Sequence, residues 1–152
     1  MTASELLSKK AYELGIDEAL FQKKGLVSVR QYENLIFTSG TGAADFRQGK
    51  VGDELTFEDG YLACQHIALI QISALRDYLG ILDRVEQILR VYAHLTVADD
   101  FHDLDKMADG FSDVFGYVFR DAGKSPRTLL GCRNLPVGNT AAEFELIAAI
   151  RG

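Results

Sequence analysis

The hydrophobic positions of the chain indicate three helices. Residues 4–14 carry apolar side chains three and four positions apart, and the glycine that follows is expected to end this helix. A longer helix is predicted over 56–80, where Thr56 and Asp59 have the spacing of a capping box. Its middle is apolar on nearly all sides, which predicts deep burial. A third helix is predicted over about 104–121.

Five segments have the β-branched, aromatic or alternating composition of strands. They are 26–32, 34–40, 84–97, 127–133 and 141–150. The first two are separated by polar residues, which predicts a hairpin. In 84–97 the odd-numbered positions are predicted to face one side of the sheet and the even-numbered positions the other.

The order of these elements, α-ββ-α-β-α-ββ, predicts an α+β fold in which helices are segregated from an antiparallel or mixed sheet. Residues 1–152 are expected to form one domain, with 1–16 as an N-terminal helical extension, because no linker or repeat interrupts the pattern. Two helices can cover only one face of the sheet. The other face also carries apolar side chains, which predicts a symmetric oligomer with pockets between its subunits.

Composition narrows the class of protein. The 152 residues carry a formal net charge of -6, which argues against nucleic acid as a partner bound through its phosphates. Two cysteines, Cys64 and Cys132, are too few for a disulfide framework and lack zinc-site spacing, so a reducing, cytoplasmic setting is expected. The N-terminus lacks the apolar region of a secretory signal, and no apolar run approaches the roughly 20 residues that span a bilayer. No membrane partner is expected.

Two loops contain motif-like sequences. Residues 39–45, SGTGAAD, nearly match the dinucleotide-binding glycine pattern, but Asp45 replaces the third glycine and no helix is predicted to begin there. Gly40, at a strand end, could still let a ligand approach the backbone closely. Residues 99–105, DDFHDLD, suit a divalent ion in residue type. Their spacing matches no calcium loop, so helix capping is the favoured role and no metal is expected.

Three other side chains have acid–base or nucleophilic chemistry. His66 on the long helix and His94 on a strand are interpreted as core residues, because no serine or cysteine forms a recognisable pair with either. Cys132 precedes Arg133, whose charge could lower the pKa of the thiol. Neighbours on a strand face opposite sides, however, so an inert thiol is favoured.

Arg127 and Glu143 are the most informative pair. Arg127 opens a strand directly after Pro126, and Glu143 shares one side of the last strand with Glu145 among apolar residues. The strand that Arg127 opens is expected to lie next to the last strand, so these side chains either form a cross-strand ion pair or frame a pocket. In a pocket, Arg127 would hold a ligand carboxylate and Glu143 would position or activate a water. Spacing alone leaves both alternatives open.

Several segments, taken in order, resemble the YjgF/RidA family, also called the L-PSP endoribonuclease family. They are SKKAYELGI, NLIFTSG, GKVGDELTFEDGYLAC, LGILDRVEQILRVYAHL and GFSDVFGYVFRDAGKSPRTLLGCRNLP, followed by EFELIAAI. The resemblance covers the whole chain, and the N-terminal helix is typical of the longer branch of about 150 residues. It implies a chorismate-mutase-like α+β fold, a mixed sheet with two helices on one face, and a homotrimer with three clefts between subunits.

The resemblance also implies a function and a set of site residues. The family's clefts bind small carboxylates such as 2-oxo acids, and RidA-type members hydrolyse 2-imino acids to 2-oxo acids and ammonia without a metal or cofactor. Arg127 is then the carboxylate anchor and Glu143 the residue that positions the attacking water. Gly40 lines the cleft through its backbone. Thr41 and Leu129 are the further binding positions, where the family often has glutamine and cysteine.

The sequence departs from the RidA pattern at two further positions, where Leu26 and Ile70 replace a tyrosine and a helix asparagine. The leading hypothesis is a trimer that binds 2-oxo or 2-imino acids through Arg127 and hydrolyses imines as a deaminase. One alternative is a non-catalytic ligand-binding or regulatory trimer, which the lost polar groups favour. The other is an L-PSP-type endoribonuclease, against which the acidic balance counts.

Overall fold

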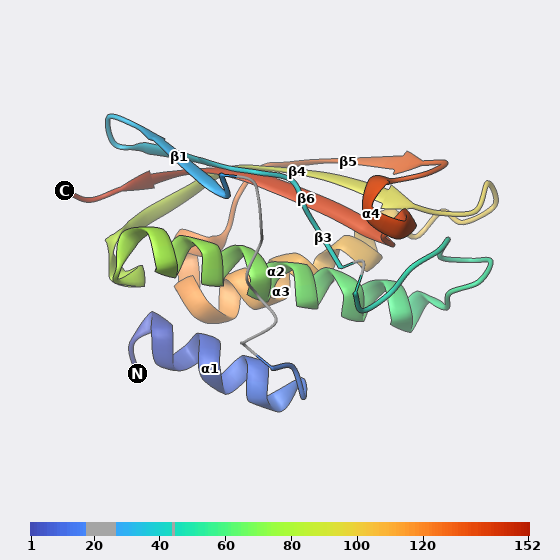
Figure 1. Cartoon of the computed structure of the whole chain (residues 1–152), viewed down its shortest axis with the longest axis horizontal. Helices are drawn as coiled ribbons and strands as arrows, with labels where there is room; N and C mark the ends of the chain where they lie inside the picture. Colours follow the sequence, from blue (N-terminus) through green and yellow to red (C-terminus); the bar gives the residue numbers. More distant parts are fainter. Residues whose placement is uncertain (18–26, 44) are drawn as a thin grey trace.

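The computed structural model describes residues 1–17, 27–43 and 45–152 (Figure 1). Its α-helices are α1 (Ala3–Glu13), α2 (Phe57–Leu79), α3 (Leu104–Phe119) and the short α4 (Pro136–Asn139). Its strands are β1 (Val29–Tyr32), β2 (Leu35–Thr38), β3 (Thr41–Gly42), β4 (Val85–Thr96), β5 (Arg127–Cys132) and β6 (Ala142–Ile150). The three predicted helices and five predicted strands are therefore present. The hydrophobic pattern did not indicate β3 or α4, because both are too short to show a period.

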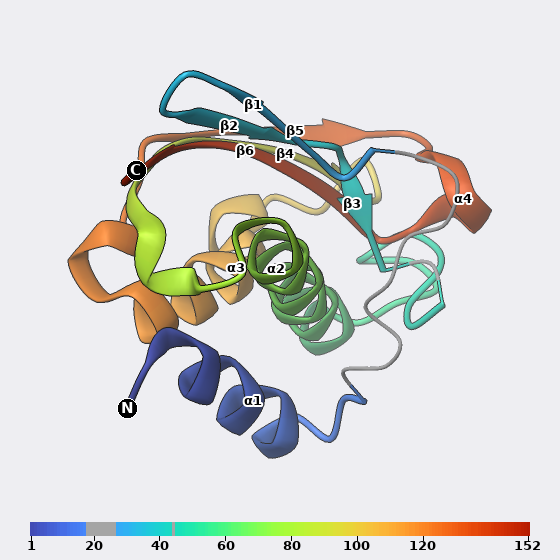
Figure 2. The ribbon, with the colours of Figure 1, turned by 60° about the vertical axis from the view of Figure 1, so that its left-hand side comes forward.

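One mixed sheet holds the described strands in the order β1-β2-β6-β4-β5, and β3 pairs with β6 as well. β1 and β2 form the predicted antiparallel hairpin. β4 and β5 are parallel, as expected for two strands joined by a helical connection, here α3. α2 and α3 cover one face of the sheet, and α1 packs beneath them as a third layer (Figure 2). No described helix covers the opposite face of the sheet.

β4 departs from strict alternation at two irregularities. Its register with β6 shifts between Val85 and Gln87 and again between Ile88 and Arg90. A β-bulge of this kind adds a residue to one strand and switches the face on which the following side chains lie. Ile88 is consequently buried and Leu89 exposed, so the predicted alternation is wrong in this part of the strand. From residue 91 to residue 95 it is confirmed.

α2 and α3 approach each other closely at a glycine. A Cβ at Gly110 would lie 2.3 Å from the backbone oxygen of Tyr61, so a larger residue fits only if a helix moves. Next to this contact the Phe111 ring stacks on Phe115 and Phe144, with ring centroids 4.5 and 4.2 Å apart. The ring stack joins α3 to β6, and the Gly110 contact joins α2 to α3.

The predicted capping box at the start of α2 is present. Thr56 and Asp59 exchange side-chain and backbone hydrogen bonds across the first turn. Asp59 Oδ1 also accepts a hydrogen bond from Arg47 Nε at 3.0 Å, which ties the preceding loop to the helix. The backbone hydrogen bond from Thr56, followed by the Arg47 guanidinium, holds the pKa of Asp59 below its ordinary value.

Gly110→Ala should lower the free energy of unfolding by about 1–3 kcal/mol, because the added methyl overpacks the contact between α2 and α3. Gly116→Ala on the same helix is the matched control, since no atom lies within 4 Å of its Cβ position. Alanine there should raise the stability by up to about 1 kcal/mol through helix propensity. Urea unfolding followed by circular dichroism measures both changes. Equal stability of the two variants would show that the helices do not meet as described.

Asp59→Asn should destabilise the protein at neutral pH and lose that effect in acid. The folded-state pKa of Asp59 is depressed below the ordinary value of 3.8. The stability that the carboxylate contributes is therefore fully present above that value and is lost as the pH falls through the folded-state pKa. Urea unfolding of the wild type and the variant, from about pH 7 to about pH 2, should show a difference in the free energy of unfolding that disappears at the acid end. A difference in the free energy of unfolding that increases in acid would contradict this role of Asp59.

Candidate functional site

Glu143 lies near the start of β6 on the uncovered face of the sheet. The even-numbered side chains of β6 are buried toward the helices and the odd-numbered ones face away, so Glu143 and Glu145 share one side, as predicted. A Cβ at Gly40 would lie 2.1 Å from Glu143 Oε1, which means that the carboxylate packs directly against this glycine. Among the described residues the half-buried Glu143 carboxylate makes no hydrogen bond or ion pair.

The side-chain amide of Gln71 fixes the backbone around this contact. Gln71 is 1% exposed in α2. Its Nε2 donates to the backbone carbonyl of Ser39 at 3.0 Å, to the Thr41 hydroxyl at 2.9 Å and to the backbone carbonyl of Phe144 at 2.8 Å. The first two acceptors flank Gly40 and the third directly follows the glutamate. Gln71 therefore holds β3 and β6 in the relative positions that bring glycine and carboxylate together.

The neighbouring predicted positions lie elsewhere. Thr41 is buried, and its hydroxyl is bound on the helix side by Gln71, so its side chain does not reach the uncovered face. Ile70 is partly buried and packs against the core. The buried side-chain amide in this part of α2 belongs instead to the next residue, Gln71. The sequence signal that could have identified it is that Gln71 is the single amide in the apolar run IALIQIS. Leu26 lies outside the described residues.

His94 is a titratable residue that lies opposite Glu143 in the sheet. The two residues are partners in the antiparallel β4–β6 pairing. Such partners point to the same face with Cβ atoms about 4.5–5.5 Å apart. His94 is partly exposed on the uncovered face, so its interpretation as a core residue is wrong. His66, by contrast, is buried with its ring 4.5 Å from the Phe46 ring, and burial lowers its pKa.

Arg127 lies on the other side of the sheet. Its partner in β4 is Val91, which is buried toward the helices, so the arginine side chain also faces the helix layer. Nη1 donates to the Ser112 hydroxyl at 3.0 Å. Nη2 donates to Asp109 Oδ1 at 2.9 Å and to the backbone carbonyl of Asp105 at 3.2 Å. All three acceptors belong to α3, and the arginine side chain remains 25% exposed.

Arg127 and Glu143 do not meet within one chain. β4 lies between β5 and β6, which separates their strands by about 9.5 Å. The expectation of neighbouring strands is therefore wrong, and so is a cross-strand ion pair within the chain. The cause is topological, because the connection through α4 passes β4 before the chain returns as β6. Leu129 pairs with Ala93 on the Arg127 side and packs against the core.

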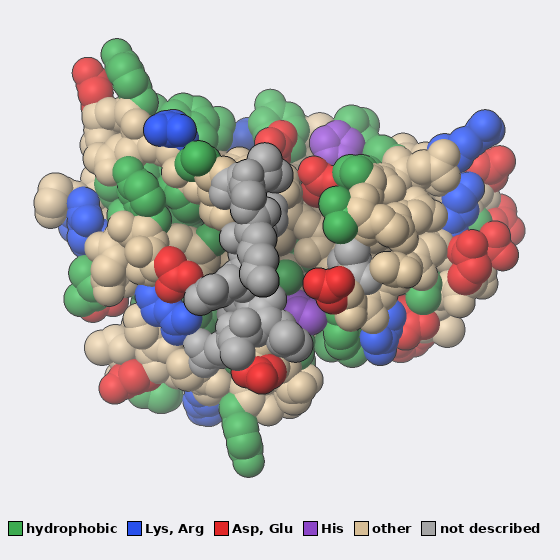
Figure 3. Space-filling view, viewed as in Figure 1, with side chains coloured by type: hydrophobic (Ala, Val, Ile, Leu, Met, Phe, Trp, Pro, Cys, Tyr) green, Lys and Arg blue, Asp and Glu red, His purple; other side chains and the backbone are tan. Residues whose placement is uncertain are grey.

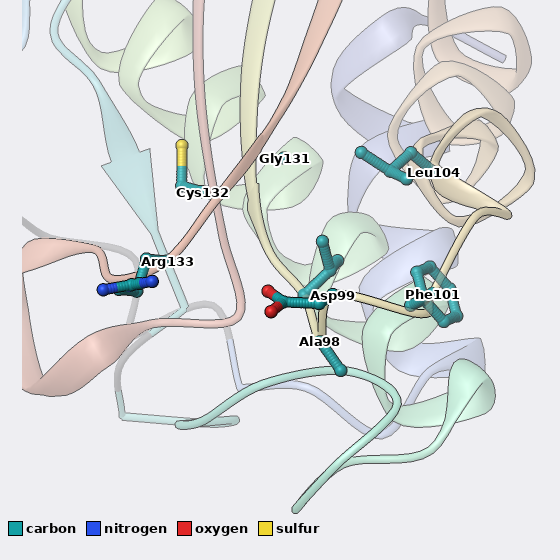
Figure 4. Close-up of a pocket in the computed structure, with 8 residues that line it drawn as sticks. Ala98, Asp99, Phe101, Leu104, Gly131, Cys132 and Arg133 are labelled. Carbon is teal, nitrogen blue, oxygen red and sulfur yellow. The ribbon is translucent and has the colours of Figure 1, made fainter.

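Cys132 and Arg133 line a separate hollow of about 250 Å³ at the end of β5 (Figure 4). The other residues that line it are Val97, Ala98, Asp99, Phe101, Leu104 and Gly131. The Arg133 side chain extends away from the Cys132 sulfur, so the guanidinium is not directed at the thiol. The second cysteine, Cys64, is fully buried, and this desolvation raises the pKa of its thiol.

The motif-like loops show neither a nucleotide-binding nor a metal-binding arrangement. In residues 1–17, 27–43 and 45–152, no group of three or more His, Cys, Asp or Glu side chains could hold a metal ion. Asp103 is the N-cap residue of α3, but its carboxylate bonds to Lys106 at 3.1 Å and does not cap the helix. Asp45 is exposed, and the next α-helix begins only at Phe57.

The surface view in Figure 3 shows Lys and Arg side chains scattered among Asp and Glu side chains, with no continuous basic area on this face. Proteins that bind nucleic acid mainly through phosphates usually present such an area. Of the helices that the structure describes, none has the length and apolar character needed to cross a membrane.

Comparison with known proteins places this arrangement in a family. Residues 26–148 match the family model described as "YjgF/chorismate mutase-like, putative endoribonuclease". A curated relative, protein TCP17 of Trypanosoma cruzi, is 31% identical over 103 residues, and this match spans 67% of the present chain and 64% of that protein's length.

Solved structures agree on the fold. A crystal structure from Shewanella oneidensis MR-1 has a TM-score of 0.82 and 24% identity, and covers 95% of this chain and 99% of that one. The structure of Escherichia coli TdcF with bound serine has a TM-score of 0.57 and 18% identity. The match covers 86% of this chain and 91% of the TdcF chain. The predicted α+β fold with a mixed sheet is thereby confirmed. Because the family model matches from the β1–β2 hairpin region to β6, the chain belongs to the YjgF/chorismate mutase-like family.

Proposed function

We propose that this protein binds small acids of the 2-oxo and 2-imino class in clefts between the subunits of a homotrimer. Arg127 of one subunit would hold the ligand carboxylate, and Gly40 and Glu143 of a neighbouring subunit would form the opposite wall. The observation that carries the proposal is the Glu143 carboxylate, which is half-buried and has no hydrogen-bond partner among the described residues. Such a group is costly unless a ligand, a water or a second subunit supplies donors.

The uncovered sheet face supports assembly. Phe37, Tyr92 and Leu130 are 40%, 38% and 52% exposed on strands that carry this face. Apolar side chains grouped on one surface favour contact with another protein surface, and identical copies usually associate symmetrically. Since the arginine and the glutamate face opposite sides of one sheet, a site that uses both requires residues from two copies.

The residues suit the hydrolysis of an imine. Arg127 would bind the ligand carboxylate through charge-assisted hydrogen bonds and hold the imine carbon near Glu143. Glu143 would accept a proton from water while the water oxygen bonds to that carbon. Glu143 then returns this proton to the nitrogen of the adduct. The C–N bond breaks and the nitrogen leaves as ammonia, while the hydroxyl oxygen forms the C=O double bond of the 2-oxo acid and gives its proton to Glu143. His94, opposite Glu143 in the sheet, would assist this transfer. The E. coli TdcF structure holds serine, an acid whose nitrogen is bonded to the carbon beside the carboxylate, as in a 2-imino acid.

Two other functions make different predictions for the same residues. A non-catalytic trimer would bind the acids without releasing ammonia, and the replacement of the family's accessory polar groups favours it. An endoribonuclease would cleave single-stranded RNA after stringent purification and lose this activity in Arg127→Ala. The scattered basic side chains in Figure 3 and the net charge of -6 count against the second alternative.

Arg127→Ala should lower the affinity for 2-oxobutyrate at least about ten-fold, because hydrogen bonds to a charged partner contribute roughly 1.5–3 kcal/mol. Isothermal titration calorimetry measures this, with thermal melts as a check on folding. Arg133→Ala is the matched control: it removes an exposed arginine beyond the end of the same strand and should bind like the wild type. Loss of binding in Arg133→Ala alone would instead locate the ligand in the hollow beside Cys132.

Glu143→Gln should keep most of the affinity for 2-oxobutyrate and lower ammonia release from imines generated in situ by about 10²- to 10⁴-fold, the usual contribution of a general base. Glu145→Gln, on the same side of β6, is the control and should retain the wild-type rate. Wild-type protein that releases ammonia no faster than buffer, while still binding the acid, would favour the non-catalytic trimer.

A further inference from the structure

The guanidinium of Arg127 already holds a carboxylate. Asp109 Oδ1 lies 2.9 Å from Nη2, which also donates to the backbone carbonyl of Asp105 at 3.2 Å. The side chains of Arg127 and Asp109 are 25% and 50% exposed, so a dissolved ligand can reach the pair. Asp109 therefore occupies the place that the carboxylate of a bound acid would take.

The donor geometry of the guanidinium turns this contact into a competition. A carboxylate binds arginine in a bidentate manner along the Nη1–Nη2 edge or the Nε–Nη2 edge, and both edges use Nη2. Nη2 has two N–H groups and already donates to two acceptors. The carbonyl of Asp105 belongs to the first turn of α3, whereas the Asp109 side chain can rotate. A bidentate ligand must therefore displace Asp109.

We propose that Asp109 competes with ligands for Arg127 and thereby selects acids that carry a cationic nitrogen beside the carboxylate. This inference rests on the proposed function, since it requires Arg127 to be the anchor. Once the ligand carboxylate occupies Nη2, Asp109 loses its cation but remains close to the α-carbon of the ligand. A protonated 2-imino or 2-amino group gives Asp109 a new ionic partner, and a neutral 2-oxo group does not.

The same competition would assist turnover. Hydrolysis converts a cationic 2-imino group into a neutral 2-oxo group and removes the nitrogen as ammonia. Asp109 then has no partner on the product and returns to Arg127, which weakens the hold on the 2-oxo acid. Substrate and product thus differ in affinity because of a residue that takes no part in the bond changes. Asp109 is a specificity-determining residue in this scheme.

The test compares two acids of equal size, 2-aminobutyrate and 2-oxobutyrate, by isothermal titration calorimetry. The wild type should bind 2-aminobutyrate more tightly. Asp109→Asn should raise the affinity for 2-oxobutyrate about two- to five-fold, the range expected when an exposed ion pair is removed, and should abolish the preference. Asp109→Ser, also neutral, should give the same shift.

Asp113→Asn is the matched control. Asp113 lies one turn further along α3 and accepts a hydrogen bond from Tyr61, so the variant should keep the wild-type preference. Weaker binding of both acids to Asp109→Asn would overturn the inference and make Asp109 a residue that orients Arg127. An unchanged preference would also overturn it. If the wild type bound neither acid, the proposed function itself would fail and this inference with it.

Discussion

The rest of the structure depends on one constraint, which is that the described helices cover only one face of the sheet. α2 and α3 bury one face around the Gly110 contact, and the opposite face presents apolar side chains together with the Glu143 carboxylate. Covering that face with other copies would remove apolar surface from water and would also desolvate the carboxylate. In the proposed trimer, assembly and completion of the site are therefore a single event.

The two halves of the proposed site are held in different ways. Glu143 and Gly40 are fixed by buried hydrogen bonds from Gln71, which leave little freedom to the backbone on either side. Arg127 instead sits on a partly exposed edge strand and is held by side chains and a carbonyl of α3. A rigid Gly40–Glu143 side and an Arg127 whose hydrogen-bond partners can be exchanged suit a protein that must bind one acid and then release a chemically altered one.

The elements of the fold were predictable because their hydrophobic periods are long and strong, as in α2 and in the second half of β4. The bulges of β4 were not, since register shifts depend on the partner strand and leave no mark in the pattern. Strand order was equally hidden, which is why Arg127 and Glu143 were expected on neighbouring strands. Gln71 and His94 were visible as polar residues, but their role depends on β3 and β6, which lie far away in the sequence.

The central claim is that Arg127 and Glu143 act across a subunit boundary. The most direct measurement is a crystal structure of the assembled protein soaked with 2-oxobutyrate. We expect a trimer in which each ligand carboxylate is bound by Arg127 of one subunit, with Gly40 and Glu143 of the adjacent subunit facing the oxo carbon. A ligand that contacts Arg127 but only residues of the same chain, or an assembly that keeps Arg127 and Glu143 on separate surfaces, would contradict the claim.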